Sequence, residues 1–444
     1  MKNVALHTLG CKVNYTETST IGRQFIQQGY QIVDTDQPCD IYVLNTCSVT
    51  ERADKECRQI IRRVLRHSPN AYVVVIGCYA QLQASEIASI AGVDLVLGAK
   101  NKFNIFEFAG DFVKHQQTQI HVSCIEEPLE FIPSYSGDVE GRTRAFLKIQ
   151  DGCDYNCSFC TIPLARGESR SLPVDQLVRQ GHMLCEQGFR EIVLTGVNLG
   201  DYGRKFNQGL LDLLKVLEQL PVDRLRISSI EPNLLIDDII NFVLSSEKFC
   251  PHFHIPLQSG SDSILKIMRR RYLSNDYRNL VESIKKMSPD ACIGADVLVG
   301  FPGETDAVFN ESYSFLKDIP VSYLHVFTYS ERENTPAIDY PNEVEMHVRH
   351  ERNEILRLLS DEKRKVFSSR YLDKSLPFLF ENTIGSNLYS GLSANYIRIN
   401  AHSDQSLTNE IHDVTITGYA NGVCSGEIIS PCSINHRYGE LILT

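Results

Sequence analysis

Three cysteines near the middle of the chain share one loop with the spacing CxxxCxxC: Cys153, Cys157 and Cys160. Three thiolates can hold three irons of a [4Fe-4S] cluster and leave the fourth iron free for another ligand. A structural zinc ion needs four ligands, but no histidine or further cysteine occurs between Cys160 and His182. The triplet therefore predicts an iron-sulfur cluster with one open iron.

A second set, Cys11, Cys47 and Cys78, is spread over the first eighty residues. Each of these cysteines follows a short apolar run that is typical of a buried strand. The carboxyl ends of parallel strands meet at one edge of a sheet, so three loops would deliver three thiols to one place. The alternative is three separate buried cysteines, which is a common environment for this residue. Spacing alone leaves both interpretations open.

The elements around these cysteines define an α/β protein in several parts. Residues 1–115 alternate apolar runs with amphipathic stretches, which predicts a parallel α/β domain. Residues 116–140 are irregular and predict a linker. In residues 141–370, six strand-like runs, among them 145–149 and 295–299, alternate with helical patterns and indicate a partial (βα)6 barrel, with the CxxxCxxC loop directly after its first strand. Residues 371–444 carry short alternating runs and predict a small all-β barrel.

Composition limits the compartment and the partners. The 444 residues contain no stretch of ~20 apolar residues and no secretory signal at the start, so we expect a cytoplasmic protein without a membrane partner. Fourteen cysteines in a reducing compartment indicate metal binding rather than disulfides. A net charge of -11 argues against nonspecific coating of nucleic acid, although it permits a local basic surface.

Several motifs resemble the methylthiotransferases of the radical S-adenosylmethionine superfamily. The amino-terminal motifs are TLGCKVN at residues 8–14, NTCSVT at 45–50 and GCYA at 77–80. The similarity continues through CTIPLARGESRS at 160–171 and HIPLQSGS at 254–261. It ends in a tail that resembles the RNA-binding TRAM domain, so the resemblance covers nearly the whole chain.

The resemblance implies two [4Fe-4S] clusters and S-adenosylmethionine as cofactors. Cys153, Cys157 and Cys160 would hold the cluster that binds S-adenosylmethionine, and Cys11, Cys47 and Cys78 would hold an auxiliary cluster; all six are the expected metal-binding and catalytic residues. Resemblance also places residues at strand ends around the cofactor: Phe159, Thr195, Gly196, Ser229, Glu231, Gln258 and Asp296. Taken singly, each of these could equally be a turn or helix-cap residue.

The chemistry implied by the resemblance is radical transfer of a methylthio group. A 5′-deoxyadenosyl radical from the central cluster would activate C2 of an adenosine at position 37 in a tRNA anticodon loop, and the auxiliary cluster would supply the methylthio group. Such an enzyme needs a reductant such as flavodoxin or ferredoxin, and a sulfur donor. An alternative from another class is a noncatalytic iron-sulfur protein that only binds RNA.

Members of this family act on threonylcarbamoyladenosine or isopentenyladenosine in tRNA, or on an aspartate of a ribosomal protein. The sequences LGCKVN and TIPLARG are most similar to the threonylcarbamoyl branch. The carboxylate of that substrate favours a cationic pocket, for which Lys12 and Arg166 are candidates. Each could equally be ordinary surface charge or charge around a cluster.

For RNA binding, Arg58, Arg62 and Arg66 recur every four residues and predict one basic helix face. Residues 269–271 are three consecutive arginines and a second candidate patch. The tail from residue 371 onward carries three Lys or Arg against seven Asp or Glu, so it would be a poor phosphate clamp. Stacking by Tyr389 or Tyr396 would have to replace charge there.

Overall fold

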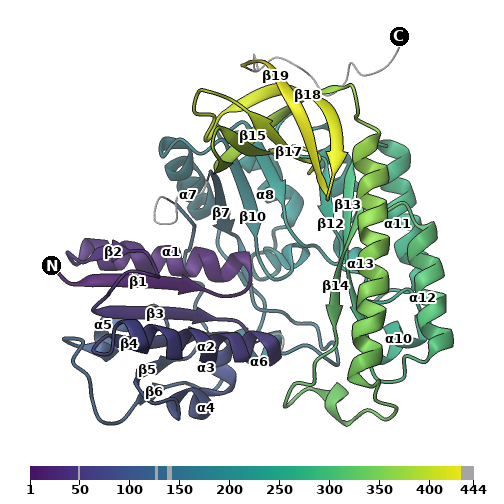
Figure 1. The fold of residues 1–444 in the computed structure, drawn as a ribbon. Helices are drawn as coiled ribbons and strands as arrows, with labels where there is room; N and C mark the ends of the chain where they lie inside the picture. The colour runs from purple at the N-terminus through teal and green to yellow at the C-terminus, as the bar shows by residue number, and fades with distance from the viewer. Residues whose placement is uncertain (49–50, 126–128, 138–142, 432–444) are drawn as a thin grey trace.

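A computed structural model of the chain describes residues 1–48, 51–125, 129–137 and 143–431 (Figure 1). It contains an amino-terminal α/β sheet, a central set of βα units and a carboxyl-terminal β-barrel, which confirms the predicted fold class. None of the helices in the described ranges combines the length and the apolar character that a membrane span requires.

The amino-terminal sheet has six parallel strands in the order β2-β1-β3-β4-β5-β6. Its central strands are buried along their whole length because helices or loops cover both faces, which explains their continuous apolar sequences. Its strands are β1 (Asn3–Thr8), β2 (Gln31–Val33), β3 (Ile41–Thr46), β4 (Tyr72–Gly77), β5 (Val93–Leu97) and β6 (Gln119–His121). Its helices are α1 (Lys12–Gln27), α2 (Glu51–His67), α3 (Cys78–Leu82), α4 (Ala84–Ala88) and α5 (Ile105–Ala109).

The segment expected to be a linker contributes structure to both neighbours. Strand β6 lies within it and pairs with β5 at the edge of the first sheet. Further along, the backbone of Ser134 and Ser136 bonds to the first strand of the central part, with Tyr135 bridged to Leu147. Residues 126–128 and 138–142 lie outside the described ranges.

The central part is the predicted half-barrel. Two three-stranded parallel sheets, β11-β10-β7 and β12-β13-β14, meet at a bridge between Ser229 and His254. Its strands are β7 (Arg144–Lys148), β10 (Glu191–Thr195), β11 (Arg224–Ile227), β12 (His252–His254), β13 (Cys292–Val299) and β14 (Tyr323–Thr328). A short hairpin of β8 (Gln150–Asp151) and β9 (Arg170–Ser171) follows the first strand.

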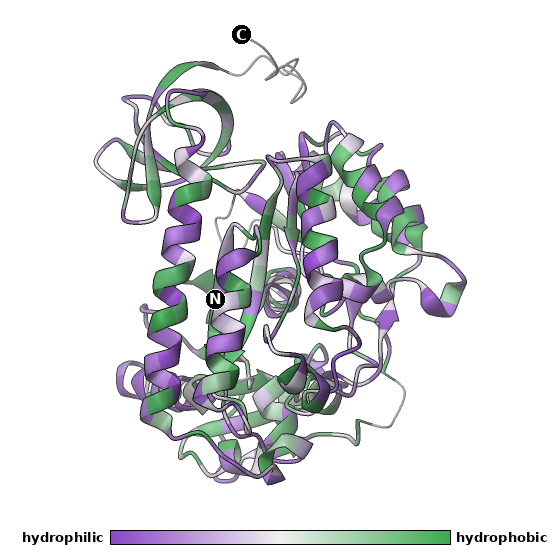
Figure 2. Cartoon of the chain, turned by 90° about the vertical axis from the view of Figure 1, so that its right-hand side faces the viewer, coloured by the Kyte–Doolittle hydropathy of each residue, from purple (hydrophilic) through white to green (hydrophobic). Residues whose placement is uncertain are grey.

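Helices follow these strands, and the longer ones cover the outer face of the half-barrel. They are α6 (Ile162–Arg166), α7 (Val174–Glu186), α8 (Leu210–Leu217), α9 (Asp237–Ser245), α10 (Asp262–Ile267), α11 (Ser274–Met287), α12 (Asp306–Asp318) and α13 (Met346–Ser369). Short 3-10 turns are η2 (Leu199–Asp201), η3 (Arg204–Phe206), η4 (Pro232–Leu234) and η5 (Pro336–Asp339). The long helices carry both hydrophilic and hydrophobic residues, as expected for helices between a sheet and solvent (Figure 2).

The inner face of the half-barrel is unusually polar. Alternate residues of a strand point to opposite faces, and the apolar half of each strand packs outward in one core that includes Leu147, Ile192 and Ile293. The register places the remaining residues on the inner face. These inner residues include Arg144, Glu191, Arg226, His252, His254, Asp296 and His325.

The carboxyl-terminal barrel is closed, with strands in the order β15-β16-β17-β19-β18. The strands are β15 (Ser375–Gly385), β16 (Leu388–Ser393), β17 (Arg398–His402), β18 (Ile411–Ala420) and β19 (Val423–Pro431). The barrel sits on the amino ends of the half-barrel strands, where Arg224 donates to the Leu392 carbonyl at 2.9 Å and Arg226 donates to the Ala394 carbonyl at 2.9 Å.

Of the two tyrosines expected to stack on RNA, Tyr389 is buried and Tyr396 is half-buried. Tyr389 is 9% exposed in the barrel core. Tyr396 stacks on His252 with ring centroids 4.1 Å apart, at the junction with the half-barrel. Burial of its ring contradicts the expectation of RNA stacking for Tyr389, and Tyr396 already packs against His252.

Candidate functional site

The three amino-terminal cysteines follow adjacent strands of the first sheet. The register pairs Thr46 of β3 with Gly77 of β4, and Cys47 and Cys78 come directly after these residues. Cys11 follows β1, which pairs with β3 on its other side, and it lies within electrostatic range of Cys78. The structure therefore brings the three thiols to one edge of the sheet.

Two contacts hold the first loop of this set against the second. Gly10 has a φ of +99°, and a Cβ atom there would lie 2.9 Å from the Sγ atom of Cys47, so glycine permits the close approach. The Asn14 side-chain amide donates to the carbonyl of Leu9 at 2.7 Å and to the carbonyl of Thr46 at 3.0 Å. Asn14 thus fixes the ends of β1 and β3 relative to each other.

The CxxxCxxC loop is organised by donors that point at its sulfurs. The backbone N–H groups two residues after Cys153 and Cys160 donate to the respective Sγ atoms at 3.4 and 3.5 Å. The Arg270 guanidinium donates to the Sγ atom of Cys157 at 3.1 Å. Such donors stabilise sulfur that carries negative charge, as cluster-bound thiolates do.

The environment of both sets fits metal binding. Burial raises the pKa of Cys153 and of Cys160 to about 12, and it also raises the pKa values of Cys78 and Cys157. Thiolates at such positions need positive charge close by, which the irons of a cluster would supply. All six cysteines are free thiols in the structure, so no disulfide competes for them.

The two thiol sets lie on contacting loops. The Thr161 hydroxyl, next to Cys160, donates to the carbonyl of Ser48, next to Cys47, at 3.4 Å. Helix α3, which begins at Cys78, packs against α6, which follows the central triplet. Arg332 adds a further connection by donating to the Ser48 hydroxyl at 2.6 Å.

A buried network of charges joins the first sheet to the half-barrel behind the auxiliary set. Arg166 donates to Glu17 at 3.0 Å and to Asp151 at 2.9 Å, and Lys102 pairs with Glu17 at 2.6 Å. Burial alone would raise the pKa of Glu17, but Arg166 and Lys102 lower it to about 2. The carboxylate therefore stays charged, and removal of one partner would leave an uncompensated buried charge.

Two of the residues expected around S-adenosylmethionine are joined through a histidine. The Ser229 hydroxyl lies 2.6 Å from Nδ1 of His254, and Nε2 of His254 lies 2.8 Å from the Asp296 carboxylate. The ring of His325 stands nearly perpendicular to that of His254, with centroids 5.4 Å apart. Ser229, His254 and Asp296 thus form one hydrogen-bonded chain across the inner face, and His325 packs against it.

The pair at the end of β10 leaves a polar atom without a partner. The Thr195 hydroxyl is buried and makes no hydrogen bond within the described residues. A Cβ atom on Gly196 would lie 2.9 Å from the carbonyl of Gln150, so glycine is needed for the tight turn. An orphaned hydroxyl beside this turn fits a polar group of a bound cofactor.

The other expected cofactor residues are spread around the same end of the half-barrel. The Glu231 carboxylate is bound by Arg270, the residue that also donates to Cys157. Gln258 has a φ of 73°, an uncommon conformation for a non-glycine residue that is often found at functional sites. Phe159 packs at right angles to Phe301, with centroids 6.2 Å apart.

Comparison with known proteins identifies the family. Residues 3–98 match the uncharacterized protein family UPF0004, and residues 147–316 match the radical SAM superfamily. The chain is 38% identical over 430 residues to the threonylcarbamoyladenosine tRNA methylthiotransferase MtaB of Bacillus subtilis, covering 94% of both chains. The chain belongs to the methylthiotransferase family of radical S-adenosylmethionine enzymes.

Other relatives of this methylthiotransferase fall into two groups by name. The MtaB protein of Aquifex aeolicus is 38% identical, covering 89% of this chain and 96% of its own. A tRNA-2-methylthio-N(6)-dimethylallyladenosine synthase of Acetivibrio thermocellus is 30% identical, covering 96% and 91%. Among solved structures, the radical S-adenosylmethionine methyltransferase TsrM of Kitasatospora setae shares the fold, with a TM-score of 0.57, 13% identity and coverage of 76% and 77%.

Sequence reasoning missed the roles of several charged residues of the methylthiotransferase. Arg270 was expected in a surface patch with its two neighbours, but its side chain is only 3% exposed and is held by Glu231 and Cys157. His254 and Glu17 also take central positions that were not assigned. No local sequence pattern predicts these roles, because the partners of these residues lie far away in the sequence.

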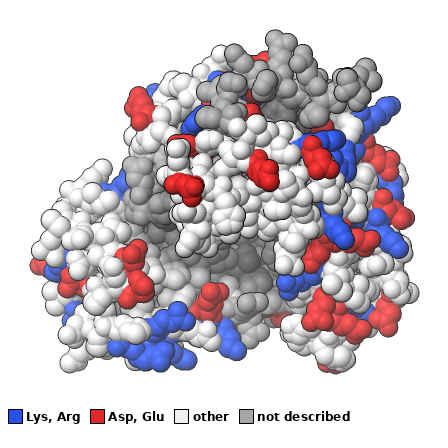
Figure 3. Space-filling view, turned by 45° about the horizontal axis from the view of Figure 1, so that its top comes forward, with Lys and Arg blue, Asp and Glu red and all other residues white. Residues whose placement is uncertain are grey.

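The predicted basic face of α2 is only partly available. Arg58 pairs with Glu86 at 2.7 Å and donates to the hydroxyl of Tyr79, whereas Arg62 and Arg66 are exposed. Over the face shown in Figure 3, acidic and basic side chains are scattered rather than gathered in one basic surface.

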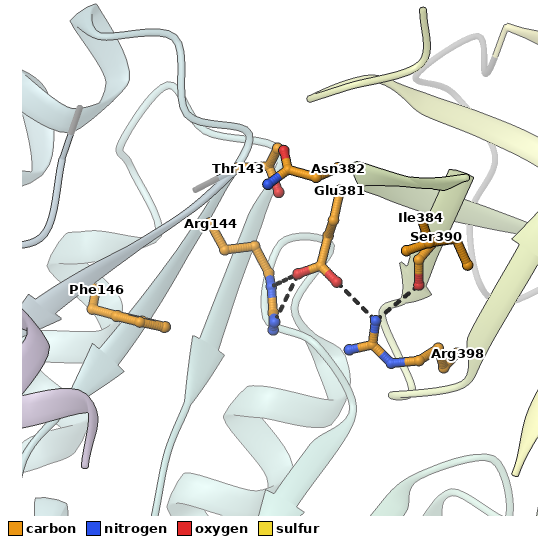
Figure 4. A pocket seen from close by; sticks show the side chains of 8 residues that line it. All are labelled: Thr143, Arg144, Phe146, Glu381, Asn382, Ile384, Ser390 and Arg398. Atoms are coloured by element: carbon orange, nitrogen blue, oxygen red, sulfur yellow. Dashed lines mark hydrogen bonds and ion pairs between the residues drawn. The ribbon is translucent and has the colours of Figure 1, made fainter. Parts of the chain in front are cut away.

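A cavity of about 390 Å³ lies between β7 and the carboxyl-terminal barrel of the methylthiotransferase (Figure 4). The Glu381 carboxylate stands between Arg144 and Arg398, at 2.9 Å from each guanidinium. The cavity opens at the amino end of β7, whereas the cysteines follow its carboxyl end. It therefore belongs to the junction of two domains and not to the thiol sites.

Proposed function

We propose that this methylthiotransferase adds a methylthio group to C2 of N6-threonylcarbamoyladenosine at position 37 of tRNA. One observation carries the choice of substrate. Relatives named as threonylcarbamoyladenosine enzymes are 34–38% identical to this chain, and those named for dimethylallyladenosine are 30–32% identical. The enzyme class itself follows from family membership.

The residues present fit two [4Fe-4S] clusters. Cys153, Cys157 and Cys160 would hold the cluster that binds S-adenosylmethionine, and the three amino-terminal cysteines would hold the second. When bound, these groups supply reductive cleavage of S-adenosylmethionine to a hydrogen-abstracting radical and the sulfur that is transferred, which an unreactive aromatic C–H bond requires. An external reductant such as flavodoxin or ferredoxin and a sulfur donor complete this proposal.

The residues of the chain would then bind and orient S-adenosylmethionine. Arg270 holds the Glu231 carboxylate beside Cys157, which directs that carboxylate toward a cationic amino group of the cofactor. The unpartnered hydroxyl of Thr195 offers one further hydrogen bond. The Ser229–His254–Asp296 chain fixes the hydroxyl and carboxylate that face a ribose or adenine.

The RNA would be bound by elements on both sides of the thiol sites. An anticodon loop is single-stranded, so one base can leave its stack at low cost. The exposed Arg62 and Arg66 of α2 are available for phosphates. We assign residues 1–115 to the auxiliary cluster, 141–370 to radical chemistry and 371–444 to substrate RNA.

The deciding experiment uses anaerobically reconstituted enzyme with two anticodon stem-loops, one carrying threonylcarbamoyladenosine and one carrying isopentenyladenosine. Mass spectrometry of the digested nucleosides measures the product. We expect a methylthio product from the threonylcarbamoyl substrate alone. A product from the isopentenyl substrate alone would assign the enzyme to the other branch.

A further inference from the structure

Lys12 is a charged residue of the auxiliary site that is left without a partner. It directly follows Cys11 and begins α1. Its side chain is exposed and makes no hydrogen bond or ion pair with any described residue. An ammonium group in that state retains all three of its donors for a ligand.

The surroundings of Lys12 place it over the inner face of the half-barrel. It lies within electrostatic range of Arg144, Arg226 and Glu191. His252 and His325, on two other strands, lie within the same range of Lys12. All of these residues belong to the polar inner face, so the ammonium group extends from the auxiliary loop toward the half-barrel. The molecule is hollowed between the amino-terminal domain and the rest of the chain on the face shown in Figure 3.

The buried arginines of the inner face and of the thiol loops are already committed to carboxylates of the protein. Arg166, the other cation considered for this role, donates to two buried carboxylates and is 2% exposed. Arg226 is paired with Glu191 at 2.8 Å, and Arg270 is paired with Glu231. Binding of a substrate anion by any of these would break a buried ion pair, whereas Lys12 has none to break.

We propose that the Lys12 ammonium binds the carboxylate of the threonylcarbamoyl group, an inference that rests on the proposed function. In adenine, C2 and C6, which bears N6, flank the same ring nitrogen. A residue next to Cys11, whose cluster would face C2, is therefore close to the substituent on N6. A charge-assisted hydrogen bond would favour this substrate, and an isopentenyl group has no acceptor to receive it.

The test compares two stem-loops that differ only in the charge of the substituent: threonylcarbamoyladenosine and its carboxyl methylamide. Equilibrium binding is measured by fluorescence anisotropy with reconstituted enzyme and S-adenosylmethionine. We expect Lys12→Met to weaken binding of the carboxylate by about tenfold to a hundredfold and to leave binding of the methylamide unchanged. Lys12→Arg should keep most of the preference. The matched control is Lys215→Met, an exposed lysine of α8, which should change neither affinity.

Iron content and 5′-deoxyadenosine formation of Lys12→Met are measured in parallel and should equal those of the parent enzyme. The inference is overturned by equal weakening for both stem-loops, by no weakening, or by loss of iron, since each would assign Lys12 another role. Failure of the proposed function is a separate result: the parent enzyme would then methylthiolate the isopentenyl stem-loop and leave the threonylcarbamoyl one unmodified.

Discussion

The two thiol sets reach similar arrangements by different routes. The central set occupies eight consecutive residues, 153–160, and its own backbone supplies hydrogen bonds to two of the sulfurs. The amino-terminal set takes one cysteine from each of three loops, which only the strand order β1-β3-β4 brings together. A site within one loop can be recognised from spacing, whereas a site built by a sheet exists only once that sheet has formed.

The largest expected effect comes from Cys157→Ala in the central loop. This variant should lose all 5′-deoxyadenosine formation and all methylthio product, because the cluster would lack one of its three thiolates. The iron content should fall from about eight to about four irons per chain. Cys185→Ala, a half-buried cysteine of α7 outside both sets, is the control. Retention of 5′-deoxyadenosine formation by Cys157→Ala would refute the assignment.

Cys47→Ala separates the two sets. We expect no methylthio product and about four irons per chain. Formation of 5′-deoxyadenosine should continue, because the central loop holds its cluster with its own three cysteines. Product analysis and iron content are measured on the same preparation, with Cys39→Ala as the control in the same domain. If Cys47→Ala also stopped 5′-deoxyadenosine formation, the two sets would not be independent.

Arg166→Met tests how strongly the sheet-built set depends on the rest of the chain. Glu17 and Asp151 would lose a buried partner, so the free energy of unfolding should fall by about 3–5 kcal/mol. Iron should be lost first from the amino-terminal set. Denaturant unfolding and iron analysis measure both effects. Arg179→Met removes an exposed pair with Asp175 and should cost less than about 1 kcal/mol. Similar losses in the two variants would count against the network.

The smallest expected effect concerns Glu191, at the amino ends of the half-barrel strands. Burial alone would raise its pKa, but Arg226, Arg144 and Arg224 lower it to about 2. A lowered carboxyl pKa gives stability that is complete above the unfolded value of ~4.3 and is lost as the pH falls toward 2. Glu191→Gln should therefore be less stable than the parent near neutral pH, and the difference should shrink on acidification. Unfolding midpoints of both proteins at several pH values measure this difference in stability. A difference that does not change with pH would contradict the prediction.

Most elements could be predicted from the sequence because parallel strands buried on both faces appear as continuous apolar runs. The run 145–149 predicted a strand that the structure places at Arg144–Lys148, and the run 295–299 is the second half of a strand that begins at Cys292. Strand β6 was missed, since Gln119–His121 is a short edge strand without an apolar run.

The charged part of the site could not be predicted in the same way. Arg270 is separated in the sequence from its partners Cys157 and Glu231 by 113 and 39 residues. Contacts at such separations produce no periodic pattern in a sequence. The functions of the two thiol sets and of the residues expected around S-adenosylmethionine remain predictions that the variants above test.

The pair between Lys102 and Glu17 has a consequence for biosynthesis. Both residues belong to the amino-terminal domain, Glu17 in α1 and Lys102 after β5, so the buried carboxylate already has a counter-ion before Arg166 leaves the ribosome. Because domains generally fold as units and the amino-terminal one folds first during synthesis, the nascent sheet can close without an isolated charge in its interior. Arg166 then docks onto a prepared surface when the half-barrel emerges.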